Sequence, residues 1–132
     1  MLLFGKVQSI ALSVIALISM ATMCGCGPVP VPVSDPALAK QLLEETLENW
    51  KAGESWDSLQ KKTQPVYVTE DLWRARCRLT NFSVLGEGEL MASNIRFRVQ
   101  LKCTSLTGKT TDRTVNYLVT TKPALTIARE EG

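Results

Sequence analysis

The side chains best suited to nucleophilic or metal chemistry are scarce in this chain of 132 residues, which has four cysteines and no histidine. The lack of histidine excludes Ser-His-Asp and Cys-His catalysis and any histidine-ligated metal site. A thiol without a histidine also lacks the usual partner that lowers its pKa. We therefore expect no metal and no cofactor, and the cysteines are candidates for lipid attachment or a disulfide.

Two of the cysteines, Cys77 and Cys103, lie in stretches where apolar and polar residues alternate. Alternation with a period of two is typical of half-buried strands, and both thiols have the parity of the apolar face. A disulfide between them is one interpretation. Two buried thiols that act as small hydrophobic side chains are the other, because a bridge needs Cα atoms about 4.4–6.8 Å apart.

Basic residues occupy the polar positions of the same two stretches, so the alternation predicts one basic sheet face. Like charges on adjacent strands repel, so an anionic surface or an acidic envelope partner could offset them. The alternative is a solvated face with carboxylates in nearby loops. The net charge of +2 and the lack of stacking aromatics on this face argue against nucleic acid. The predicted face consists of Arg74, Arg76, Arg78, Arg96, Arg98 and Lys102.

The N-terminal residues 1–25 resemble a bacterial lipoprotein signal peptide. Lys6 precedes the apolar run Ile10–Met23, which fits a signal-peptide core of roughly 7–15 residues and is short of the ~20 needed to cross a bilayer. An uncleaved membrane anchor is the alternative. Because Gly25 is small, Cys26 is the expected lipid acceptor, with Cys24 as the alternative.

The resemblance implies a membrane anchor of acyl chains, palmitate among them, on Cys26. Residues 26–35 then form a stiff polyproline spacer, and residues 36–132 form the domain. Gly27, where Asp would favour retention at the inner membrane, implies the outer membrane, with the domain facing the periplasm. Removal of Cys24 leaves an even pair of cysteines in an oxidising compartment.

The domain begins with a predicted helix. Asp35 is a suitable N-cap, Pro36 suits the first helical position, and Gly53 suits a left-handed C-terminal cap. A second short helix is expected from about Ser55 to Lys61. The apolar face of the first helix is predicted to consist of Leu38, Leu42, Leu43, Leu47 and Trp50.

Beyond Pro65 the alternation predicts three to four antiparallel strands, which start near Trp73, Ile95 and Val115. The first two are expected to connect loosely around Gly86–Glu89. A three-residue loop at Thr107–Lys109 would place Leu101 opposite Val115 and Val99 opposite Tyr117. Pro123 is expected to bend the chain before a last stretch, Leu125–Ile127. The fold class is therefore α+β, with the N-terminal helix packed on a curved sheet.

Three segments, Trp50–Gly53, Asp71–Trp73 and Val115–Pro123, resemble the cystatin-like roll of the nuclear-transport-factor-two and SnoaL-like superfamily, and in particular its small bacterial lipoproteins. Related isomerases pair an Asp base with a Tyr donor on an apolar floor, an environment that tunes carboxylates. Asp71 and Tyr117, with Tyr67 as a second phenol, are the corresponding candidates. Asp71 lies at the start of a strand, however, where a capping role is commoner.

These features favour a lipid-anchored envelope protein whose domain binds or scaffolds a partner without catalysis. The alternative is a small-molecule binding protein or isomerase-like enzyme that uses the interior of the roll. All three tryptophans and Phe97 could line such a cavity, although side chains of this kind usually fill a small core.

Overall fold

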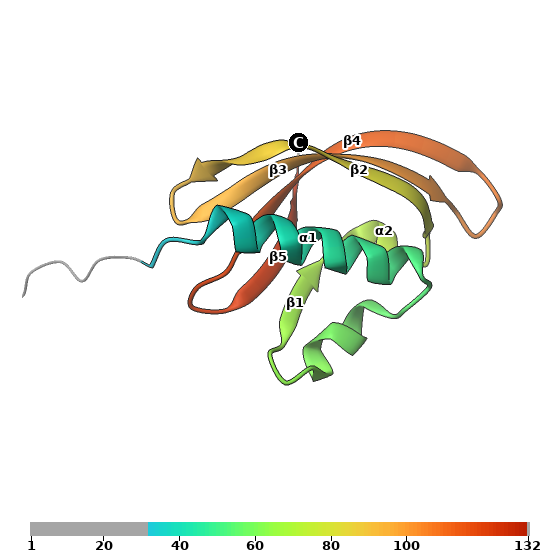
Figure 1. The fold of residues 1–132 in the computed structure, drawn as a ribbon. Helices are drawn as coiled ribbons and strands as arrows, with labels where there is room; N and C mark the ends of the chain where they lie inside the picture. Colours follow the sequence, from blue (N-terminus) through green and yellow to red (C-terminus); the bar gives the residue numbers. More distant parts are fainter. Residues whose placement is uncertain (1–31, 132) are drawn as a thin grey trace, which may run out of the picture. The chain divides into compact units, whose positions relative to one another are not determined.

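The computed structural model describes residues 32–131, so the predicted signal and most of the spacer lie outside it. The described chain forms an α+β domain, which confirms the predicted class (Figure 1). Its elements in order are α1 (Pro36–Lys51), the 3₁₀ helix η2 (Trp56–Lys61), β1 (Val66–Thr69), α2 (Asp71–Arg74), β2 (Arg78–Met91), β3 (Asn94–Thr104), β4 (Thr110–Thr120) and β5 (Leu125–Glu130). None of the helices within residues 32–131 has the length and apolar character needed to span a membrane.

Helix α1 starts where the sequence predicts. The Asp35 side chain accepts a hydrogen bond from the Ala37 amide at 3.0 Å. Leu38 is 43% exposed, contrary to prediction, and Ala39 takes its place on the buried face. The reason is the spacing: the buried positions recur at intervals of three and four residues, which keeps them on one side of the helix. They are Ala39, Leu42, Leu43, Thr46, Leu47 and Trp50.

Replacing Asp35 with alanine is expected to lower the free energy of unfolding by about 1 kcal/mol, because it removes the side-chain acceptor at the helix N-terminus. Urea unfolding followed by circular dichroism measures the change. Asp35→Asn keeps an acceptor and should stay within a few tenths of a kcal/mol of the wild type. Equal losses in the two variants would contradict this role of the cap.

The sheet has five strands in the order β1-β5-β4-β3-β2, so the prediction of three to four strands is wrong. Strand β1 is the unpredicted one; with four residues it is too short for alternation to be distinctive. It pairs parallel with β5, with Val66 opposite Leu125, whereas the other pairs are antiparallel. Pro123 separates β4 from β5, in agreement with the expected bend.

Strands β3 and β4 bury the predicted alternate residues, but their predicted register is wrong by two residues. Val115 lies opposite Val99, and Tyr117 lies opposite Phe97. The cause is the loop, which spans residues 105–109 instead of three residues. A shift of two keeps the same side chains on the inner face, so the core is unaffected.

Strand β2 runs through the stretch where a connection was expected. Gly86 and Gly88 have φ of +77° and +88° and produce a register shift between Leu85 and Glu89. The chain turns only beyond Met91, which pairs with Asn94. The two glycines therefore form a bulge, which bends a strand. Figure 1 shows β2, β3 and β4 arching over α1, an arrangement compatible with the predicted roll.

The strand expected from Trp73 starts only at Arg78. Residues Asp71–Arg74 form helix α2, because the Glu70 side chain caps it by accepting the Leu72 amide at 2.9 Å. The next two residues complete the turn, and Arg76 has a φ of +61°. Arg74 and Arg76 consequently do not belong to the predicted basic sheet face.

Candidate functional site

Glu70 is the only charged residue within residues 32–131 that is fully buried, at 2% exposure. Its Oε1 accepts hydrogen bonds from the Leu72 amide at 2.9 Å and from Arg129 Nη1 at 3.1 Å. Its Oε2 accepts one from the Tyr117 hydroxyl. Both carboxylate oxygens are therefore satisfied inside the domain, which is the condition for burying a charge.

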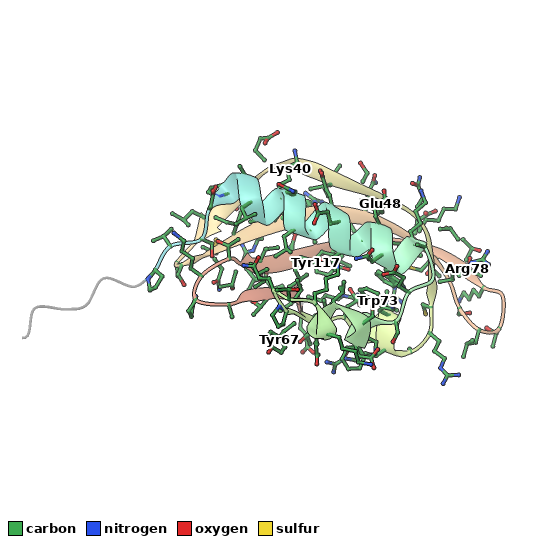
Figure 2. The ribbon with its side chains drawn as sticks, turned by 60° about the horizontal axis from the view of Figure 1, so that its bottom comes forward. Lys40, Glu48, Tyr67, Trp73, Arg78 and Tyr117 are labelled. Atoms are coloured by element: carbon green, nitrogen blue, oxygen red, sulfur yellow. The ribbon has the colours of Figure 1, made fainter. Side chains whose placement is uncertain are left out.

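The candidate base Asp71 is not the hydrogen-bond partner of Tyr117. Asp71 is exposed at the start of α2, and Tyr67 is 50% exposed, whereas Tyr117 is 1% exposed. Figure 2 places Tyr67 and Tyr117 apart. The partner of Tyr117 is the residue before Asp71. Burial, followed by the charge of Glu70, raises the pKa of Tyr117, so its hydroxyl stays protonated and donates.

Cys77 and Cys103 form no disulfide in the structure: both thiols are free, and Cys77 is half-buried whereas Cys103 is buried. Cys77 precedes β2, and Leu79 is the residue opposite Cys103. Burial raises the pKa of Cys103 from 9.0 to about 11. The pKa of Cys103 is higher in the folded chain than in the unfolded chain. The contribution of this thiol to the free energy of unfolding is therefore fully present below pH 9.0 and is lost as the pH rises to about 11.

An alkylating reagent such as iodoacetamide is expected to modify Cys77 in the folded protein at pH 8 and to spare Cys103, because the thiolate is the reacting form. Mass spectrometry of proteolytic peptides measures both sites. Cys103 should react at the same rate as Cys77 once the chain is unfolded in urea. Comparable modification of the two thiols in the folded protein would contradict the burial of Cys103.

The predicted basic sheet face is offset in part by carboxylates on adjacent strands. Arg96 lies opposite Glu89 and forms an ion pair with Glu130 of β5. Lys102 lies opposite Asp112. Sequence analysis placed such carboxylates in loops, because it could not give the register that aligns them. The residues of the prediction that do lie on strands are Arg78, Arg96, Arg98 and Lys102.

Arg74 and Arg76, which do not lie on this face, line a pocket together with the tryptophans. A surface pocket of about 550 Å³ lies at the C-terminal end of α1, next to η2, α2 and the start of β2. Figure 2 shows Trp73 and Arg78 toward that end of the domain. We call it the Trp–Arg pocket, and its principal residues are Trp50, Trp56, Trp73, Arg74, Arg76 and Arg78.

The aromatic wall of the Trp–Arg pocket is fixed by hydrogen bonds. The rings of Trp50 and Trp73 stack, with centroids 5.5 Å apart. Trp50 Nε1 donates to the Cys77 carbonyl at 2.8 Å, and Trp73 Nε1 donates to the Glu54 carbonyl at 2.9 Å. Both indole N–H groups are thus satisfied, as buried donors require. The wall joins the end of α1 to the segment that enters β2.

The basic wall comes from the end of α2. The Arg74 guanidinium lies 4.6 Å from the centre of the Trp56 ring, a cation–π contact. Beyond it the Arg76 amide donates to the Trp73 carbonyl at 3.0 Å, and the Cys77 amide donates to the Leu72 carbonyl at 2.9 Å. This pair of bonds is a Schellman motif, whose left-handed residue is usually glycine. Here that residue is arginine.

Replacing Arg76 with glycine is expected to stabilise the fold by about 0.5–1 kcal/mol, because glycine adopts positive φ without a Cβ penalty. The midpoint of urea unfolding measures the change. Arg76→Ala removes the same guanidinium but keeps a Cβ, so it should bring no such gain. A stabilised alanine variant would attribute the effect to charge and contradict the backbone argument.

The chain matches no protein-family model, no curated protein and no solved structure. Within residues 32–131, no group of three His, Cys, Asp or Glu side chains is placed to hold a metal ion.

Proposed function

We propose that this protein is a lipid-anchored component of the cell envelope. Its domain binds or scaffolds a partner and does not catalyse a reaction. Cys26 carries the acyl chains, and the domain faces the periplasm from the outer membrane. More than one acyl chain gives stable anchoring, where a single chain is marginal. The cystatin-like roll of the nuclear-transport-factor-two and SnoaL-like superfamily is the fold we propose for the domain.

The observation that carries the binding role in this proposal is the contrast between buried and exposed ionic groups. Proton transfer requires a substrate atom within hydrogen-bond reach of the acid or base. Glu70 and Tyr117 are at most 2% exposed and already bond each other. Arg74, Arg76 and Arg78, in contrast, form no ion pair within residues 32–131 and line an open pocket. The available groups therefore favour binding.

The last residues of the predicted spacer are hydrogen-bonded to the domain. The Ser34 amide donates to the Ser93 carbonyl at 3.0 Å, and Ser34 Oγ accepts from the Thr121 amide at 2.9 Å. The Asp35 amide donates to Thr121 Oγ1 at 3.0 Å. These bonds attach Ser34 and Asp35 to the turn between β2 and β3 and to the residue after β4, so the predicted spacer ends at a fixed point of the domain.

Incorporation of radiolabelled palmitate in bacterial cells tests the proposal. The wild type and the Cys24→Ala variant should be labelled and found in membranes, whereas Cys26→Ala should be unlabelled. An unlabelled wild type would contradict lipid anchoring. Label that persists in Cys26→Ala and disappears in Cys24→Ala would contradict the choice of acceptor.

A further inference from the structure

We infer that the Trp–Arg pocket binds a phosphate monoester group, carried either by a soluble phosphate ester or by the headgroup of a lipid such as phosphatidic acid. This inference names the ligand class for the proposed binding function and rests on that function. It does not depend on the lipid anchor, because every residue that carries it lies within the described domain.

Charge is the first argument. Three arginines line one pocket, and Glu54 is the one acidic residue among its lining residues. None of the arginines is neutralised by an ion pair within residues 32–131. Guanidinium groups donate hydrogen bonds in a planar fork that matches phosphate and carboxylate oxygens. Three such groups suit the three terminal oxygens and the near-dianionic charge of a phosphate monoester better than a carboxylate.

The backbone at Arg76 is the second, independent argument. A φ of +61° is unfavourable for arginine, and the Schellman motif at this position is ordinarily completed by glycine. Unfavourable backbone conformations persist where the surrounding structure enforces them, and they cluster at ligand sites. The left-handed turn lies between two other arginines of the same pocket, Arg74 and Arg78. An arginine at position 76 supplies a guanidinium group for a ligand of this pocket, which a glycine could not.

Preorganisation is the third argument. Arg74 is held over the Trp56 ring, and its Nη2 donates to the Val68 carbonyl at 3.4 Å. The stacked pair of Trp50 and Trp73 is fixed by two hydrogen bonds to backbone carbonyls. Binding groups that are already ordered lose less conformational entropy when a ligand arrives. The partly exposed Trp56 offers an apolar surface to the organic part of the ligand.

Intrinsic fluorescence reports on this site directly, because all three tryptophans of the chain line the pocket. The full chain, solubilised in a nonionic detergent, is titrated in two arms. One arm adds inorganic phosphate or glycerol phosphate at constant ionic strength, with chloride as the reference anion. The other adds phosphatidic acid to the micelles, with phosphatidylcholine as the reference lipid.

A saturable fluorescence change is expected in at least one arm. Arg76→Gln and Arg76→Gly should weaken it at least tenfold, because each removes a charge-assisted contact. Arg98→Gln is the matched control: it removes an exposed arginine from β3, outside the pocket, and should leave the affinity unchanged. A response to the soluble anions identifies a free ester as the ligand source, and a response to phosphatidic acid alone identifies a headgroup.

Three results would overturn the inference. They are no response in either arm, an equal response to chloride, and an equal loss in Arg98→Gln and Arg76→Gln. Loss of folding does not confuse the test, because Arg76→Gly is expected to be more stable than the wild type. A protein that binds phosphate without palmitate on Cys26 would retain the ligand site and lose the proposed anchor, so the two failures are distinguishable.

Discussion

Replacing Glu70 with alanine is expected to lower the free energy of unfolding by about 3–5 kcal/mol, the range for breaking a buried ion pair by removing one partner. The variant loses three interactions at once. The Tyr117 hydroxyl, buried at 1% exposure, loses its acceptor. Arg129 loses its ion pair, and helix α2 loses its N-cap.

Urea unfolding of the wild type, Glu70→Ala and Asp71→Ala measures this effect with a control one residue away. Asp71 is exposed, so its replacement should change stability by about 0.5 kcal/mol or less. Similar losses in the two variants would contradict the central structural role of the Glu70 carboxylate. A Tyr117→Phe variant should be much less destabilised than Glu70→Ala, because it leaves the cap and the ion pair intact.

Replacing Gly88 with alanine is expected to cost about 2–4 kcal/mol, from overpacking of the core together with positive φ. A Cβ at this position would lie 2.6 Å from Phe97 Cε1 and 2.7 Å from Ile95 Cγ2. Both neighbours are fully buried and cannot withdraw without disturbing the core. The φ of +88° adds the strain of a left-handed residue.

Gly86 is the matched control, since it belongs to the same bulge and has a φ of +77° but would place a Cβ with no atom within 4 Å. Gly86→Ala should therefore cost only the backbone penalty, about 1–2 kcal/mol. Thermal unfolding separates the two variants. Equal shifts in Tm would mean that the Cβ at position 88 is accommodated, contrary to the close packing described.

The sequence predicts a helix or strand well where the spacing of its apolar residues repeats many times. Helix α1 repeats its apolar spacing over four turns, and β3 alternates over eleven residues. The stretch around Trp73 alternates too, yet it folds as one helical turn followed by a Schellman motif. Glu70 decides this outcome by capping α2, and a local cap outweighs four or five residues of alternation.

Glu70 itself was predictable in part. Val66 and Val68 are buried on β1 while Tyr67 and Thr69 face outward, and the same parity places Glu70 inside. The sequence analysis missed this because it did not identify β1. The strand is only four residues long, and its partner β5 lies far along the chain, so no local pattern indicates the parallel pairing.

The Trp–Arg pocket could not be predicted, although each of its residues was noted. Sequence analysis placed the tryptophans inside the roll, as core or as the lining of a cavity, and the arginines on a sheet face. Only the left-handed turn at Arg76 brings the two groups together. Turns of this kind usually have glycine at the left-handed position, so an arginine does not indicate one. An arginine at a position of positive φ leaves no signature in composition or periodicity.

The mass of the mature protein, extracted from bacterial membranes and measured intact, tests the central claim most directly. The account predicts a chain that begins at Cys26 and carries the additional mass of a diacylglycerol and an acyl chain. A chain that retains residues 1–25, carries no lipid and is recovered from the soluble fraction would contradict it.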